Sequence, residues 1–132
     1  MLIDDYFQVI HETIETCPAV HSSDVTYDKR TSYQGFIKGV ILILDNSTLH
    51  FREFVDVETD VELYMYAYHY QRGNQFIFRY DNTEHHRRLK LATFPHHKHD
   101  RDEANVIVAS APTLAAVLAE IETLLDMSQL SR

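Results

Sequence analysis

The middle of this chain contains four or five extended runs in close succession, at 24–31, 35–44, 48–57, 61–71 and 75–81. Short turn segments separate two pairs of these runs, Asp45 to Ser47 and Arg72 to Asn74. Turns of this length and composition suit β-hairpins. We therefore expect consecutive runs to pair as neighbouring strands of an antiparallel meander.

Two amphipathic segments flank the extended runs. In residues 2–17 apolar side chains recur at spacings of three and four, which predicts a helix that ends before Pro18. A second helix is expected near the C-terminus, with Ser110 as its N-cap and Pro112 in its first turn. The predicted fold class is α+β: an antiparallel sheet of about five strands in a meander, with an N-terminal and a C-terminal helix packed on it.

The run at 61–71 alternates between two kinds of side chain. One face would carry Leu63, Met65 and Ala67, and the other would carry Tyr64, Tyr66, Tyr68 and Tyr70. With a loop of two or four residues at the Gly73 turn, Phe76, Phe78 and Tyr80 would join Leu63 and Met65 in the core, whereas a three-residue loop would reverse this register. The tyrosine face is expected to lie under a helix or against a second copy of the chain, and a homodimer would use this face.

Length and composition favour one soluble domain covering residues 1–132. Cys17 is the single cysteine, which excludes an internal disulfide and favours a reducing cytoplasm. The longest apolar run, 40–44, is far below the roughly 20 residues of a membrane span, and the N-terminus carries acids where a secretory signal has basic residues. We expect a cytoplasmic protein without a membrane partner.

The segment from Arg79 to Asp100 gathers five of the nine histidines. From His85 to Arg101 it has five basic residues and one acid, although the whole chain has a formal net charge of -8. Such a local inversion of charge predicts a site for an anionic partner.

Three interpretations of this segment compete. The first is acid–base chemistry on a phosphodiester, because histidine titrates near neutrality and can both take and donate a proton. The acid–base candidates are His85, His86, His96, His97 and His99. The predicted phosphate contacts are Arg79, Arg87, Arg88 and Lys98, with Asp81 orienting a histidine or the loop.

The second interpretation is a metal site. In an extended segment His97 and His99 point to one side while His96 points away, so the pair would supply two ligands and His85 or His86 a third. Nearby cations oppose the binding of a metal ion, and Asp81 and Asp100 would partly offset this repulsion. The third interpretation is a solvated loop without a site. On the strand before, Arg52 and Glu53 are expected to form a solvated pair or a cross-strand contact.

The segment also resembles a known family, the TumE-like proteins. The resemblance rests on Arg79 to Asn82, His85-His86, the string FPHHKH at 94–99, Asn105-Val106 and the apolar stripe of the closing helix, with LHFREFVD at 49–56 similar to the family's middle strand. It implies a toxin of a type II toxin–antitoxin system with a cognate antitoxin as partner.

The leading hypothesis is therefore a toxin that acts on RNA by histidine acid–base chemistry, as a metal-independent endoribonuclease without a cofactor. The alternatives are a non-catalytic module that binds an acidic protein partner, and a metal-dependent hydrolase.

Overall fold

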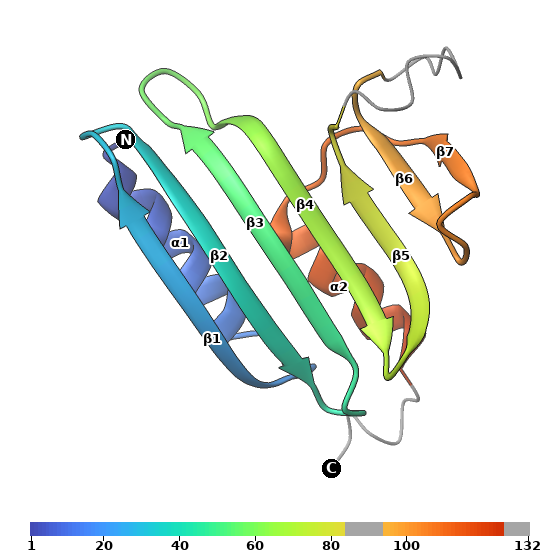
Figure 1. Cartoon of the computed structure of the whole chain (residues 1–132). Coiled ribbons are helices and arrows are strands. Elements are labelled where there is room, and N and C mark those ends of the chain that lie inside the picture. The colour runs from blue at the N-terminus through green and yellow to red at the C-terminus, as the bar shows by residue number, and fades with distance from the viewer. Residues whose placement is uncertain (84–93, 126–132) are drawn as a thin grey trace.

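The computed structural model describes residues 1–83 and 94–125. It contains a single seven-stranded antiparallel sheet, in which the strands follow one another in sequence order from β1 to β7, with both helices on one face (Figure 1). The strands are β1 (Val20–Lys29), β2 (Gln34–Ile43), β3 (Thr48–Asp56), β4 (Glu62–Arg72), β5 (Gln75–Asp81), β6 (His97–Asp100) and β7 (Val106–Val108). The helices are α1 (Ile3–Glu15) and α2 (Leu114–Leu124). The predicted fold class is confirmed.

The sheet has two strands more than the five predicted. Strand β6 lies inside the histidine-rich segment and pairs with β5, and β7 pairs with β6. In β6 the sequence HKHD places polar side chains on both faces of the strand. The alternation of apolar and polar residues that marks a half-buried strand is therefore absent there.

The predicted register between β4 and β5 was wrong. The hairpin has the expected two-residue loop, because Arg72 pairs with Gln75 and Gly73 adopts a positive φ of 59°. The register then shifts by one residue between Gln71↔Phe76 and Tyr70↔Phe78, so Ile77 forms a β-bulge. A bulge of one residue exchanges the two faces of a strand. Phe78 therefore lies opposite Tyr70 on the helix-covered face and not with Met65, which is exposed.

The tyrosine face of β4 is the core of the protein. Tyr66, Tyr68 and Tyr70 are at most 1% exposed and belong to one apolar cluster with the buried residues of α1 and α2. Because the chain's own helices lie on this face (Figure 1), the face cannot serve as a homodimer interface. The alternative expectation, tyrosines under a helix, is confirmed, although Tyr64 is 48% exposed.

Glu53 also faces this core. Its side chain is fully buried and accepts hydrogen bonds from the hydroxyls of Tyr6 (2.5 Å) and Tyr68 (2.6 Å). The expected solvated pair with Arg52 was therefore wrong, because the two residues are adjacent in β3 and point to opposite faces of the sheet. The alternative expectation, a cross-strand contact, is confirmed for Glu53 by its hydrogen bond from Tyr68 of β4.

The two helices begin close to where the sequence predicted. In α1, Ile3, Tyr6, Ile10 and Ile14 form the buried stripe. In α2 the N-cap is Thr113, whose side chain accepts a hydrogen bond from the amide of Ala116, and not Ser110 as predicted. Within the described residues, no helix has the length and apolar character needed to cross a membrane.

Candidate functional site

The face of the sheet opposite the helices carries the polar residues of interest. Two rows of directly opposed residues run across this open face from β2 to β6. The first, here the histidine row, consists of Val40, His50, His69, Arg79 and His99. The second, the aspartate row, consists of Lys38, Arg52, Ala67, Asp81 and His97. Side chains opposed in this way lie within contact distance of their row neighbours.

At the β5–β6 end the two rows meet in a buried cluster, which we call the Asp81 cluster: Arg79, Asp81, His97 and His99. His97 and His99 are 1% and 2% exposed, and their rings lie 4.9 Å apart. The prediction that these two histidines share one side of the chain is thus confirmed. Strand pairing sets the arrangement, because Asp81 is opposite His97 and Arg79 is opposite His99.

Asp81 is the acceptor at the centre of the cluster. Its Oδ2 accepts a hydrogen bond from Nε of Arg79 at 3.0 Å, and its Oδ1 accepts from the amide and the hydroxyl of Thr83. Burial alone would raise the pKa of the Asp81 carboxyl, but the hydrogen bonds from Thr83 and Arg79 and the contact with His97 outweigh burial and lower it. The carboxylate is therefore ionised at neutral pH.

The backbone fixes how the two imidazoles are turned. Nδ1 of His97 lies 2.8 Å from the carbonyl oxygen of Pro95, and Nδ1 of His99 lies 2.7 Å from that of Glu103. A carbonyl oxygen only accepts, so both Nδ1 atoms carry protons. Both Nε2 atoms therefore face Asp81, at 2.7 Å from Oδ1 for His97 and 3.6 Å from Oδ2 for His99.

His99 is neutral in this setting. Burial lowers the pKa of its imidazole; the hydrogen bond to Glu103 opposes this effect, and the charge of Arg79 adds to it. With the proton on Nδ1, the lone pair on Nε2 accepts from the Arg79 guanidinium at 3.3 Å. Arg79 also donates to Oε1 of Glu103 at 3.0 Å, so its guanidinium joins the cluster to the surface.

Two other predicted site residues lie on the opposite face of the sheet. The ring of His96 stacks on that of Tyr66, and its Nδ1 lies 3.0 Å from the Tyr66 hydroxyl. Lys98 contacts Glu120 of α2 at 2.8 Å. The structure therefore does not bring His96 or Lys98 to the Asp81 cluster. Four further predicted residues, His85, His86, Arg87 and Arg88, lie outside the described residues.

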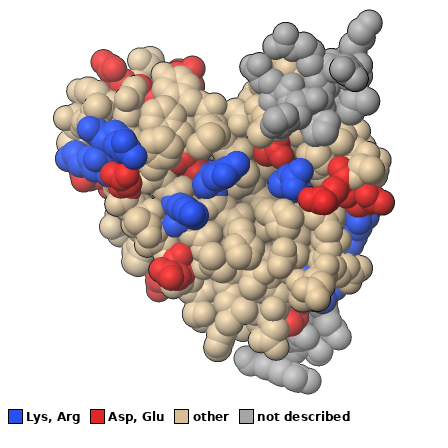
Figure 2. All heavy atoms as spheres, viewed as in Figure 1, with Lys and Arg blue, Asp and Glu red and all other residues tan. Residues whose placement is uncertain are grey.

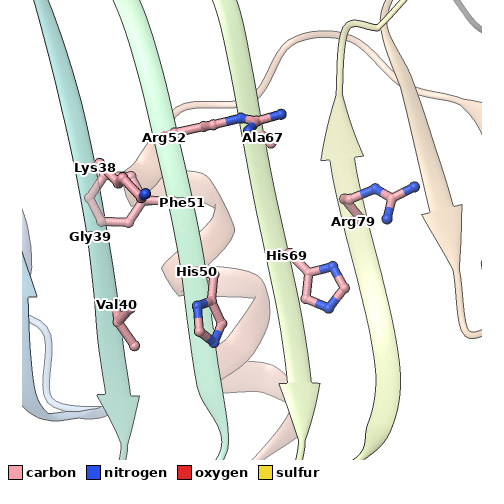
Figure 3. Close-up of a pocket in the computed structure, with 9 residues that line it drawn as sticks. All are labelled: Lys38, Gly39, Val40, His50, Phe51, Arg52, Ala67, His69 and Arg79. Carbon is pink, nitrogen blue, oxygen red and sulfur yellow. The ribbon is translucent and has the colours of Figure 1, made fainter.

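The middle of the two rows forms a pocket of about 280 Å³ on the open face. Figure 3 shows its lining: Lys38, Gly39, Val40, His50, Phe51, Arg52, Ala67, His69 and Arg79. The Arg52 side chain extends across β4, while Arg79 points away from β5 towards β6 (Figure 3). Among the described residues, the lining of this open-face pocket has three cations and two histidines and no carboxylate.

The two histidines of the pocket are cross-strand partners. The rings of His50 and His69 lie 6.5 Å apart, edge to face. Nε2 of His69 lies 3.0 Å from the side-chain oxygen of Gln71 and donates to it, which leaves the lone pair on Nδ1. Burial lowers the pKa of His69; the Gln71 hydrogen bond opposes this effect, and the charges of Arg79 and His50 reinforce it. The lowered pKa favours the neutral form of His69, which can accept a proton, in a pocket lined by three cations.

The charge on this face contrasts with that of the whole chain. Figure 2 shows several Lys and Arg side chains across the middle of the face, with Asp and Glu side chains beside some of them, above a broad uncharged area. A second pocket, of about 380 Å³, shares Lys38 and Arg52 with the first. Lys38 and Arg52 therefore contribute positive charge to both pockets, and the second pocket also contains the ion pair of Arg30 and Asp28.

Sequence reasoning missed His50, His69 and Lys38. A signal was present, because His50 and Arg52 alternate with the apolar Leu49 and Phe51 in β3. That alternation marks polar residues on one face of a strand, but only the observed register brings β2, β3, β4 and β5 into common rows.

Comparison with known proteins gave one finding. The model of the family described as Toxin TumE matches residues 9–125 of the 132. The match extends from α1 through the end of α2 and so includes the Asp81 cluster and the open-face pocket. No curated protein and no solved structure matches the chain.

Proposed function

This chain belongs to the TumE toxin family, and we propose that it exerts its toxicity by cleaving RNA on the open face of its sheet. Membership of the family makes it the toxin of a toxin–antitoxin module with an antitoxin as its partner. The RNA substrate, the histidine chemistry and the residues involved are the content of the proposal.

One observation carries the proposal. The strand register places His50 and His69 side by side in a pocket with Lys38, Arg52 and Arg79, in a chain of formal net charge -8. The described residues that line this pocket include no carboxylate. Cations bind a phosphate and stabilise the charge that develops on it, and a pair of imidazoles supplies a base and an acid. RNA also carries its own nucleophile, the 2′-hydroxyl, so this chemistry requires no metal.

In the proposed reaction His69 is the base and His50 is the acid. Nδ1 of His69 takes the proton of the 2′-hydroxyl, and the 2′-oxygen attacks phosphorus. The bond between phosphorus and the 5′-oxygen breaks, and His50, as the imidazolium, gives its proton to that oxygen. The products are a 2′,3′-cyclic phosphate and a 5′-hydroxyl. The lowered pKa of His69 favours its role as base.

The Asp81 cluster has a positioning role in this scheme. His97 and His99 are too deeply buried to touch a substrate on the open face, so we assign them to the support of Arg79 and not to acid–base chemistry. Arg79 contacts Asp81 and His99 within the cluster and lines the open-face pocket. Arg79, which was proposed as a phosphate contact from the histidine-rich segment, lines this pocket, and this position supports its proposed role.

Expression of the chain without its antitoxin tests the proposal. The test variant carries His50→Gln and His69→Gln, and the control carries His11→Gln and His21→Gln, two exposed histidines on α1 and β1. Growth and RNA integrity are followed in parallel. We expect the wild type and the control to arrest growth and degrade RNA, and the test variant to do neither.

Two results would count against the proposal. Growth arrest with intact RNA in the wild-type culture would remove the nuclease and favour a non-catalytic interaction module. Undiminished RNA degradation by the folded His50/His69 variant would show that the reaction uses other residues.

A further inference from the structure

We propose that Asp81, His97 and His99 form a binding site for one divalent transition-metal ion of the Zn²⁺ type. The inference concerns a group of buried residues apart from the acid–base pair, and it does not depend on RNA cleavage. It assigns an ion to three side chains that the proposed reaction uses only to support Arg79.

Three buried side chains direct their ligand atoms towards one point. The ligand atoms of Asp81, His97 and His99 all lie within 4.8 Å of one another, and all three residues are buried. The two histidines come from one strand at positions i and i+2, and the carboxylate comes from the strand beside it. Three buried ligands on two hydrogen-bonded strands are held in place before any ion arrives, which reduces the entropy lost on binding.

Each of the three ligand side chains is also held in place by a hydrogen bond from or to the backbone. In metal sites a histidine ligand donates its other ring N–H to a carbonyl or carboxylate, which fixes the tautomer and the ring orientation. His97 donates to Pro95 O and His99 to Glu103 O, so both present Nε2 towards Asp81. The amide and hydroxyl of Thr83 hold the carboxylate of Asp81 in turn.

The ligand types select the class of ion. Two imidazole nitrogens and one carboxylate oxygen suit Zn²⁺, Co²⁺, Ni²⁺ and related ions, whereas Mg²⁺ and Ca²⁺ prefer sites built from oxygen atoms alone. We therefore expect Zn²⁺ and Co²⁺ to bind and Mg²⁺ not to compete.

Arg79 is the natural competitor of this ion. Its guanidinium contacts Oδ2 of Asp81 at 3.0 Å and Nε2 of His99 at 3.3 Å, which are two of the atoms that would ligate a metal. An ion can bind only if the guanidinium moves. The Arg79 side chain is 28% exposed and already lines the open-face pocket, so it has a place to go. Ion binding would thus move a positive charge towards the pocket.

Metal titration of the whole chain, purified without an affinity tag and dialysed against EDTA, tests the inference. Co²⁺ is the probe, followed by its visible absorption, and Zn²⁺ binding is followed by the rise in melting temperature. We expect one ion per chain. His97→Gln and His99→Gln should each weaken binding by at least about 100-fold, since each removes a ligand outright. His50→Gln with His69→Gln is the matched control and should bind as the wild type does.

Arg79→Gln separates a metal site from an ion-pair network. If the guanidinium competes with the ion, its removal should tighten binding by about tenfold or more, since a neighbouring positive charge is lost. If Arg79 is the permanent cation of the cluster, the wild type will not bind Co²⁺ or Zn²⁺ at one per chain, and that result overturns the inference whether or not Arg79→Gln binds. Loss of binding in the His50/His69 control, with retention in the His97 variant, would also overturn it.

Wild-type protein alone gives a second measurement in case a cluster variant does not fold. Addition of Zn²⁺ should shift the Nε2 resonances of two histidines, both with a protonated Nδ1, in ¹⁵N NMR spectra. Shifts at Nδ1, or at histidines without that tautomer, would contradict the proposed ligands. Neither readout uses RNA cleavage, so failure of the nuclease proposal would leave these results interpretable.

Discussion

Replacement of Asp81 by asparagine tests how much the Asp81 cluster contributes to folding. The substitution keeps the shape of the side chain and removes its charge. The carboxylate is 3% exposed, and it joins β5 to β6 through His97 and to its own strand through Arg79. The experiment uses EDTA-dialysed protein, so that no bound ion contributes to the difference.

The size of the effect follows from the contacts that are lost. The amide oxygen of asparagine can replace Oδ1 and still accept from Thr83, but its NH₂ group then faces Nε of Arg79, which is also a donor. Removal of one partner from a buried ion pair costs about 3–5 kcal/mol. Arg79 is 28% exposed and keeps its contact with Glu103, so we expect the lower end, about 3 kcal/mol. In a chain of this length that is roughly a 10 °C lower melting temperature.

Glu103→Gln is the matched control. It removes the other carboxylate from the same guanidinium, at the same distance of 3.0 Å, but its side chain is 65% exposed. An exposed ion pair contributes about 0–1 kcal/mol. Urea and thermal unfolding of the three proteins measure both effects. If Asp81→Asn and Glu103→Gln cost the same, the cluster does not stabilise the β5–β6 pairing as argued.

Two further predictions concern buried acids elsewhere. Tyr68→Phe removes one of the two phenol groups that donate to the fully buried Glu53, and we expect it to lower the free energy of unfolding in urea by about 1.5–3 kcal/mol. Tyr64→Phe, at an exposed site, should leave the free energy of unfolding unchanged. Equal effects of the two substitutions would show that the hydrogen bond to Glu53 does not stabilise the fold. At Asp45 burial raises the carboxyl pKa, but hydrogen bonds within the turn and to Arg72 outweigh it and lower the pKa. A carboxyl group whose pKa is lowered by folding stabilises the protein at pH values above its pKa in the unfolded chain, which is about 3.9. Asp45→Asn should therefore lower the free energy of unfolding by about 1 kcal/mol at pH 7. The difference should become progressively smaller below about pH 4. A difference that does not change with pH in unfolding titrations would contradict this.

Local patterns predicted the fold class but not the faces of the sheet. The stripe of α1 and the turns at 45–47 and 72–74 were sufficient for a meander flanked by two helices. The bulge at Ile77 was not predictable, because nothing in the local sequence marks an extra residue in β5. That one residue exchanged the expected faces of β5 relative to β4. It therefore decided which side chains joined the tyrosine core.

The candidate site was predictable in part for the same reason. The alternation of His97 and His99 follows from any extended chain, and the structure confirms it. The same alternation predicts that Lys98 lies on the helix-covered face of the sheet. Its contact with Glu120 could not be predicted, because it depends on where α2 packs. The pocket around His50 and His69 depends on the register of four strands. The residues of the histidine-rich segment are close together in the sequence and could be recognised there. His50 and His69 are close together only in the folded structure.

The chemical nature of the RNA ends tests the central claim most directly. The purified chain is incubated in EDTA with a labelled RNA oligonucleotide and, separately, with a DNA oligonucleotide of the same sequence. The masses of the products are then determined by mass spectrometry. We expect cleavage of RNA to a 2′,3′-cyclic phosphate and a 5′-hydroxyl, intact DNA, and no cleavage by the His50/His69 variant. Intact RNA, cleaved DNA, or products with a 5′-phosphate would contradict it.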